Sequence, residues 1–186
     1  MYKRQVTSRP AGLYARLGTP AGLEVTVPDA AALTLQQAET MVARLERHME
    51  TDGANAEGWL LLARSQTALK RYGAAGQSYA RLLALAPGDA ATLADYAEVL
   101  ASAQGSSFRG APEQVLRRAL RIDPNHPKGL FLLGSAQFER GDAAAAIQTW
   151  NVLSGLLPES DDLYKATASN LEEARASLSG ATESAR

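Results

Sequence analysis

Three prolines recur in this chain at almost regular spacing, each after a short apolar stretch: Leu85-Ala86-Pro87, Ile122-Asp123-Pro124 and Leu157-Pro158. Pro124 and Pro158 are 34 residues apart. Pro87 and Pro124 are 37 apart, which is the same period plus an insertion of three residues. A period of this length is typical of units made of two antiparallel helices that stack along the chain. The spacing therefore predicts an all-α fold built from repeated helix hairpins.

Side-chain size follows a fixed order within the units. The first helix places a large apolar residue four positions before a small one, which allows close approach, and the second helix places a small residue four positions before a bulky one. The first-helix pairs are Trp59 with Ala63, Leu93 with Ala97 and Leu130 with Gly134, and the second-helix pairs are Ala75 with Tyr79 and Ala146 with Trp150. With the period, this order indicates tetratricopeptide repeats (TPR).

The middle unit departs from the pattern. Pro112 and Leu116 occupy the positions that hold a small and a bulky residue elsewhere. Proline is tolerated in the first turn of a helix, where its missing N–H has no helical partner. The second helix of the middle hairpin is therefore predicted to carry this proline in its first turn.

Stacked hairpins need a covering helix at each end, because no unit buries its apolar face alone. Thr34-Leu-Gln-Gln37 has the pattern of a capping box, and apolar residues at steps of three and four follow it, which predicts an amphipathic helix at about 34–51. Downstream, Asp161 or Asp162 is placed to cap a final helix at about 161–179. We therefore predict a TPR solenoid of three hairpins between two covering helices.

The predicted domain organisation has three parts. Residues 1–33 carry several prolines and glycines without a sustained period and are interpreted as an extended lead-in. Residues 34–180 form the TPR domain, and residues 181–186 form a frayed tail. Within the domain, the repeats are predicted at about 55–87, 88–124 and 125–158.

Composition narrows the class of partner. The 186 residues are 46% apolar with a formal net charge of -1, and the 19 basic and 20 acidic residues are interspersed, which argues against a nucleic-acid partner. There is no cysteine, so no disulfide or thiolate metal site exists. No run of about 18 apolar residues occurs, which argues against direct membrane insertion by this stretch.

Enzyme chemistry finds little support in the sequence. His48 and His126 lie far apart without a ligand pattern and are interpreted as solvated. Adjacent acidic pairs on helices do not face each other, so they favour solvated or capping roles. We therefore predict a binding module, not an enzyme, with no catalytic residues, no metal site and no cofactor.

The concave groove of the repeats is the predicted binding surface. It is lined by first-helix residues one position beyond the packing residues, and these are Leu60, Arg64, Thr67, Ala94, Glu98, Ala101, Phe131, Ser135 and Phe138. Phe131 and Phe138 are seven residues apart and share one helix face, which suits an amphipathic helix or an extended peptide. Arg64 and Glu98 add opposite charges that would orient it.

Other readings of these aromatic residues exist. In the alternative interpretation, Phe131 and Phe138 do not line the groove but pack against the C-terminal covering helix. Trp59, Tyr79, Tyr96 and Trp150 occupy the packing positions of the repeat and are interpreted as core. The lysine and asparagine clamp with which some TPR proteins hold a peptide carboxylate is not present as a set, because those positions hold Leu60, Arg64 and Asp95.

A narrower resemblance covers about residues 10–158. It rests on Tyr14-Ala-Arg-Leu-Gly-Thr-Pro20, on Ala56-Glu-Gly-Trp-Leu-Leu-Leu-Ala63, on Ala94-Asp-Tyr-Ala-Glu98, on the glycine-containing insertion that ends in Pro112, and on the last hairpin, with Phe138-Glu-Arg-Gly-Asp142 and Ala146-Ile-Gln-Thr-Trp150. Together these stretches resemble the C-terminal TPR domain of the CcmI/CycH cytochrome c biogenesis family. The insertion and the Leu-Gly-x-Pro lead-in are its specific parts.

The resemblance implies a non-catalytic role. It implies that the domain holds unfolded apocytochrome c, chiefly by the client's C-terminal helix, and presents it to the haem ligation complex. It also implies a location on the periplasmic side of the bacterial inner membrane, anchored by N-terminal segments absent from this chain.

Two alternatives remain open. One is a generic TPR adaptor in envelope or secretion assembly, without preference for cytochrome helices. The other is a structural or self-associating scaffold, in which Phe131 and Phe138 would be buried against the molecule itself or against a second copy.

Overall fold

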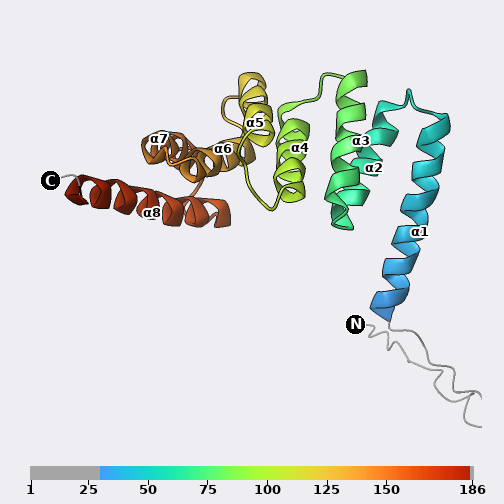
Figure 1. The fold of residues 1–186 in the computed structure, drawn as a ribbon, viewed down its shortest axis with the longest axis horizontal. Helices are drawn as coiled ribbons and strands as arrows, with labels where there is room; N and C mark the ends of the chain where they lie inside the picture. Colours follow the sequence, from blue (N-terminus) through green and yellow to red (C-terminus); the bar gives the residue numbers. More distant parts are fainter. Residues whose placement is uncertain (1–29, 185–186) are drawn as a thin grey trace, which may run out of the picture. The chain divides into compact units, whose positions relative to one another are not determined.

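The structure, a computed structural model, describes residues 30–184 (Figure 1). That part of the chain is entirely helical, without a strand. Its helices are α1 (Ala30–Thr51), α2 (Ala56–Ala68), α3 (Tyr72–Leu85), α4 (Ala90–Ala103), α5 (Ala111–Ile122), α6 (Pro127–Glu139), α7 (Ala143–Ser154) and α8 (Asp162–Ser184). The chain divides after Gln37 into two units, and the second, residues 38–186, contains the hairpins.

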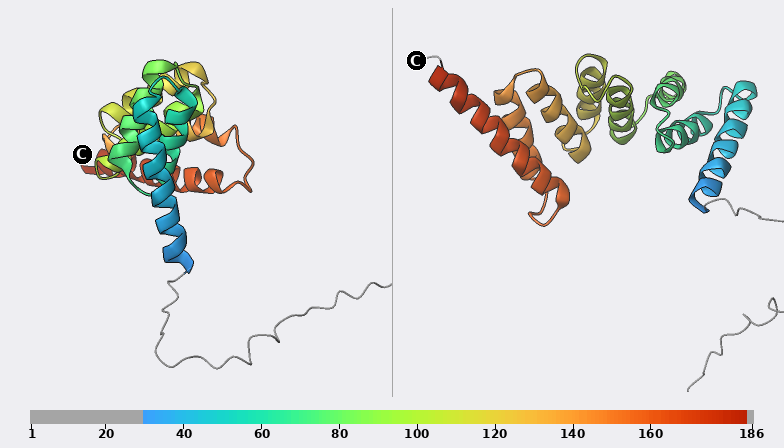
Figure 2. Two further views of the ribbon diagram at one scale, coloured as in Figure 1. Left: turned by 90° about the vertical axis from the view of Figure 1, so that its right-hand side faces the viewer. Right: turned by 60° about the horizontal axis from the view of Figure 1, so that its bottom comes forward.

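Three helix pairs form the hairpins predicted from the sequence. α2 packs on α3, α4 on α5, and α6 on α7, with short connections between the partners (Figure 2). Each hairpin contacts the next, through α3 with α4 and through α5 with α6, and α4 also contacts α6. α8 packs on α7 as the C-terminal covering helix. The prediction of an all-α TPR fold with three hairpins is therefore confirmed.

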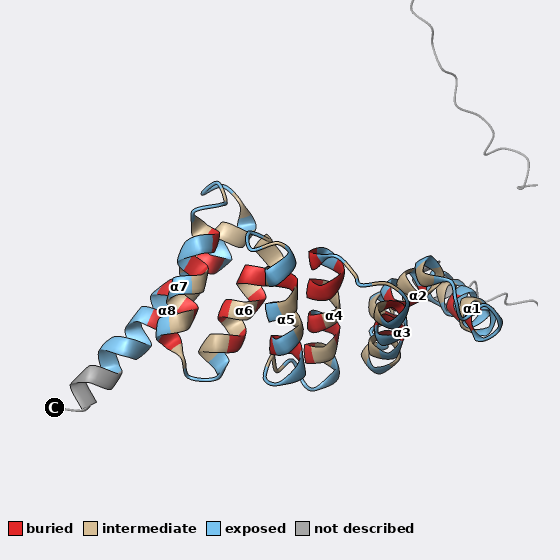
Figure 3. Cartoon of the chain, turned by 90° about the horizontal axis from the view of Figure 1, so that it is seen from above, coloured by how far each residue is buried: buried red, intermediate tan, exposed pale blue. Residues whose placement is uncertain are grey.

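The pairing of small with bulky residues explains the close packing inside the hairpins. Ala63, Ala75 and Tyr79 lie together in one buried cluster, and buried residues follow the facing sides of the helices in Figure 3. In the last hairpin, Trp150 lies directly against Gly134: a Cβ atom on this glycine would be 2.3 Å from Trp150 Nε1. That same nitrogen donates a hydrogen bond of 3.1 Å to the backbone oxygen of Phe131.

The middle hairpin begins its second helix as predicted. α5 carries Pro112 in its first turn, and Leu116 is fully buried. The insertion before it is a closed loop, because Gln104 Nε2 donates to the carbonyl oxygens of Ser107 and Arg109 at 2.6 and 3.0 Å. Positive φ angles of 78° at Gly105 and Gly110 explain the glycines at these two turns.

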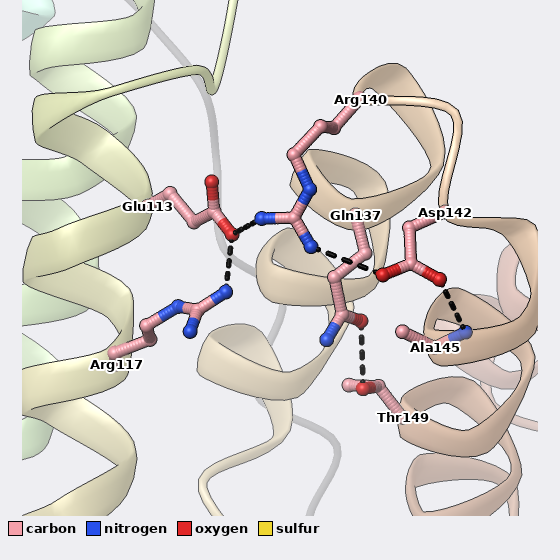
Figure 4. Close-up of polar contacts among 7 residues, drawn as sticks. All are labelled: Glu113, Arg117, Gln137, Arg140, Asp142, Ala145 and Thr149. Carbon is pink, nitrogen blue, oxygen red and sulfur yellow. Dashed lines mark hydrogen bonds and ion pairs between the residues drawn. The ribbon is translucent and has the colours of Figure 1, made fainter.

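A polar network ties the loop ends of the second and third hairpins together (Figure 4). Oε1 of Glu113 accepts hydrogen bonds of 2.5 Å from Arg117 on its own helix and from Arg140 at the end of α6. Arg140 also contacts Asp142 at 3.2 Å, and Asp142 accepts from the N–H of Ala145 to cap α7. The side chain of Glu113 is only 11% exposed, so these two arginines replace much of the water that would otherwise contact its carboxylate.

The covering helices differ from prediction at their outer ends. α1 begins at Ala30, four residues before the predicted start, so Thr34 lies in the second turn and not at the N-cap. The sequence before Thr34 is Ala-Ala-Ala-Leu, and high helix propensity extends the helix through it. Of the predicted lead-in at 1–33, residues 30–33 are instead helical, and residues 1–29 lie outside the described residues.

At the other end, the cap is as predicted but the helix is longer. Oδ1 of Asp161 accepts from the N–H of Leu163 at 2.7 Å, and Leu171 and Ala174 of α8 join the core cluster of Trp150. α8 continues to Ser184, beyond the predicted end at 179, so the glycine at 180 lies inside the helix and does not end it. The helical region therefore includes 181–184, which belong to the predicted frayed tail at 181–186.

Candidate peptide-binding surface

The predicted groove corresponds to a hollow on the side of the hairpins formed by the first helices, α2, α4 and α6. Its volume is about 290 Å³. Seven side chains line it, and we call this set the charged hollow: Arg64, Thr67, Tyr79, Asp95, Glu98, Val99 and Lys128. The hollow therefore draws on all three hairpins.

Four charges in the hollow alternate in sign. Lys128 Nζ lies 2.6 Å from Asp95 Oδ1 and 2.6 Å from Glu98 Oε2, which links α6 to α4. The other oxygen of Asp95 lies 3.9 Å from Nη2 of Arg64, which links α4 to α2. The side chains are partly exposed, from 31% at Asp95 to 56% at Arg64, so each ion pair alone contributes little stability.

Burial and the ion pairs change the titration of two residues in the hollow. Burial disfavours the charge of Lys128, but hydrogen bonds to Asp95 and Glu98 outweigh it, and the pKa of the lysine is raised. The pKa of Tyr79 is raised by burial and by the negative charge of Asp95, which Arg64 offsets only in part. The lysine therefore stays charged at neutral pH.

The structure brings together only part of the predicted groove. Arg64, Thr67 and Glu98 line the charged hollow. Ala94 and Ala101, predicted for the same surface, are 0% and 1% exposed and cannot contact a ligand. The reason is that α4 packs on α3, α5 and α6 at once, so neighbouring hairpins cover positions that are open in a helix with fewer neighbours.

The remaining predicted residues lie partly within the core. Leu60 is half-buried against the cluster of Tyr79. The hydroxyl of Ser135 donates to the backbone oxygen of Phe131 at 3.0 Å, so it is occupied within its own helix. These two positions offer a ligand little polar contact of their own.

Phe131 and Phe138 are half-buried and pack within the last hairpin. Both lie against the cluster that contains Trp150 and, from α8, Leu171. The rings of Phe138 and Trp150 are 6.0 Å apart between centroids and tilted by 49°, a favourable aromatic geometry. Their role in the core is thus established by contacts, and only their exposed edges are available to a partner.

Sequence reasoning missed four residues of the hollow. The repeat pattern predicts Tyr79 as core and gives no signal for Val99, although each also lines the hollow. Asp95 stands at a position of the carboxylate clamp that it does not match, which gives no signal for this site. Lys128 lies in the first turn of α6 and reaches α4 because of its long side chain, which one helical period does not reveal.

The histidines have no ligand partners in the described part of the chain. His48 is exposed, 3.9 Å from Asp52. His126 differs from the predicted solvated role, because its Nδ1 accepts from the N–H of Gly129 at 3.1 Å and caps α6.

Among residues 30–184, no group of three or more histidine, aspartate or glutamate side chains is placed to hold a metal ion. None of the helices there has the length and hydropathy to cross a membrane.

Solved structures of similar shape are TPR proteins at low sequence identity. The crystal structure of MamA matches with a TM-score of 0.60 and 14% identity, over 82% of this chain and 95% of that one. The crystal structure of YrrB, described as a TPR protein with an unusual peptide-binding site, matches with a TM-score of 0.60 and 16% identity, over 82% and 80%. Identities this low support the fold alone.

The curated sequence relatives are cytochrome c-type biogenesis proteins. The cytochrome c-type biogenesis protein CycH of Pseudomonas aeruginosa PAO1 is 31% identical over 137 residues, which is 74% of this chain and 34% of that protein. The cytochrome c-type biogenesis protein CcmH of Escherichia coli K12 is 24% identical over 134 residues, 72% of this chain and 38% of that protein. The chain thus spans about a third of the length of these curated relatives.

A family model covers most of the chain. The model described as the cytochrome c-type biogenesis protein H TPR domain matches residues 6–164, which includes all three hairpins. The resemblance seen in the lead-in and in the insertion is thereby confirmed. This chain belongs to the family of cytochrome c-type biogenesis protein H TPR domains.

Proposed function

We propose that this domain binds apocytochrome c and holds the client's C-terminal helix against the α2, α4 and α6 side of the hairpins. The observation that carries the proposal is a hollow shared by all three hairpins in a domain of a cytochrome c biogenesis family. An amphipathic helix in a groove is a recurring mode of peptide recognition. A role in cytochrome c maturation follows from the family.

The chemistry of the hollow is suited to holding, not to bond making. Tyr79 and Val99 close the bottom of the hollow with only 1% and 2% of their surfaces exposed, and four paired charges surround it. A helix that lies over the hollow would meet these four charges with its polar edge. We propose that the domain has no catalytic role and that haem attachment takes place on partner proteins.

The proposal also covers the proteins to which the domain passes its client and the cell compartment in which it acts. After binding the client, the domain would present it to the proteins of the haem ligation complex. We place this exchange on the periplasmic side of the bacterial inner membrane. What supports this placement is the membership of the cytochrome c biogenesis family.

The proposal is tested by calorimetric titration of this domain with a peptide of an apocytochrome c C-terminal helix, beside a scrambled peptide of identical composition. We expect micromolar or tighter binding of the first peptide and none of the second. Equal binding of the two peptides would leave a generic TPR adaptor, and absence of binding would contradict the proposed function.

A variant that fills the hollow locates the binding. Thr67→Phe places an aromatic ring where Thr67 now lines the hollow, and it is expected to weaken binding by about tenfold or more. Ala80→Phe, on an exposed position of α3, is the matched control and should leave the affinity unchanged. Circular dichroism melting of both variants separates blocked binding from lost folding.

A further inference from the structure

The charges of the hollow are not equivalent. Lys128 and Asp95 lie in the middle of the series Arg64, Asp95, Lys128, Glu98, and each of them has a partner on both sides. Lys128 shares its ammonium between two carboxylates at 2.6 Å, and both oxygens of Asp95 face a cation. The middle pair is therefore satisfied within the molecule.

The two outer charges retain unused hydrogen-bonding capacity. Arg64 is 56% exposed; its guanidinium, which carries five N–H donors, interacts with the hydroxyl of Tyr79, and its nearest carboxylate is 3.9 Å away, beyond hydrogen-bond distance. Glu98 is 52% exposed; its Oε2 contacts Lys128, and its Oε1 has no partner among the described residues. The hollow thus presents a guanidinium fork from α2 at one end and a carboxylate oxygen from α4 at the other.

The balance of these charges decides what the hollow can distinguish. Two cations and two anions sum to zero, so a ligand gains little from its net charge. A ligand that places an acidic group at Arg64 and a basic group at Glu98 gains at both ends, whereas the opposite order meets like charges at both ends. The order of charges along the ligand matters more than their number.

On this basis we propose that the hollow fixes the direction in which a helical segment of the client lies. The segment would carry an acidic side chain over α2 and a basic side chain over α4. The inference rests on the proposed function and deepens it, because it specifies which helices the site accepts and in which orientation. Arg64 and Glu98 are the residues that determine specificity.

The test uses two peptides of the same composition. One is the C-terminal helix peptide of apocytochrome c, and the other is its isomer, in which acidic and basic residues have exchanged positions while the apolar face is unchanged. We expect the isomer to bind about fivefold more weakly or worse, with a difference that shrinks as salt is added. The exchange variant Arg64→Glu with Glu98→Arg should reverse the preference.

Two controls keep the test decisive. Arg121→Glu with Glu172→Arg exchanges charges at exposed positions on α5 and α8, and it should keep the preference of the native domain. Arg64→Gln with Glu98→Gln removes the outer charges without creating like-charge contacts, and it should abolish the preference even if the exchange variant folds poorly.

The outcomes separate the inference from the proposed function. If both peptides bind the native domain equally, the orientation by charge is refuted while client binding stands. If the exchange variant folds and keeps the native preference, the assignment to Arg64 and Glu98 is refuted. If neither peptide binds, the proposed function fails and the inference fails with it.

Discussion

Close contact between one glycine and one tryptophan defines the packing of the last hairpin. The four-residue spacing of Leu130 and Gly134 predicted a small residue at the helix contact, and in the structure Trp150 occupies the space that a Cβ atom would need. The sequence placed both residues at packing positions, because the first and last hairpins share this order of small and bulky residues, but it did not pair one with the other.

Gly134→Ala tests that contact. Its Cβ would meet Nε1, Cδ1 and Cε2 of Trp150 at 2.3–2.6 Å, so we expect a loss of about 1–3 kcal/mol from overpacking. Gly76→Ala is the control, since its Cβ would lie 3.8 Å from Leu100 and helix propensity should stabilise it by about 0.5–1 kcal/mol. Chemical denaturation measures both, and equal effects would show that Trp150 moves away freely.

The sequence predicted groove residues correctly only where the exposure of a side chain is decided by its position on its own helix. Arg64 and Glu98 extend from first helices into the hollow, as the repeat geometry indicated. Ala94 and Ala101 do not, because neighbouring hairpins bury them, and that depends on packing between units. Lys128 reaches Asp95 on the neighbouring hairpin because its side chain is long, and the repeat period of the sequence does not predict such a contact.

At the scale of elements, α5 is joined to α6 by one buried carboxylate. Glu113→Gln keeps an oxygen that can accept from Arg117 and Arg140 but removes the charge that both arginines face. We expect a loss of about 1–2 kcal/mol, less than for a fully buried pair because the arginines are 50% and 40% exposed. Glu172→Gln, exposed on α8, is the control. If the two variants melt at the same temperature, the network contributes nothing to stability.

Two helix caps predict the response to acid. Asp89 Oδ1 accepts from the N–H of Thr92 and Asp142 Oδ1 from the N–H of Ala145, and these backbone hydrogen bonds lower the pKa of both carboxyl groups from 3.8. Since the folded pKa lies below the unfolded one, this stabilisation is present above about pH 4 and is lost as pH falls through the folded pKa values.

The double variant Asp89→Asn with Asp142→Asn isolates the caps. Asparagine still accepts the capping hydrogen bond but does not titrate. Its melting temperature should therefore fall less than that of the native domain between about pH 5 and about pH 2.5. Parallel curves for the two proteins would assign the acid sensitivity to other groups.

At the scale of the whole molecule, the proline period and the spacing of small and bulky residues predicted three hairpins and two covering helices. The outer ends of those helices were harder to predict, because the start of α1 at Ala30 and the end of α8 at Ser184 depend on local helix propensity without a repeat to define them. The insertion before α5 was visible as extra length. The sequence did not predict the closed form of this loop, in which the N–H of Phe108 donates to Glu139 of α6 at 2.7 Å.

The measurement that tests the central claim most directly is a titration of the isotope-labelled domain with the apocytochrome c helix peptide, followed by NMR at each backbone amide. If the client lies in the charged hollow, the largest shifts should occur at Arg64, Thr67, Asp95, Glu98 and Lys128, on three helices that are distant in sequence. Exposed positions on α3 and α5 should change little. Chemical-shift changes confined to α3 and α5, or an unchanged spectrum, would contradict the proposal that the client lies in the charged hollow.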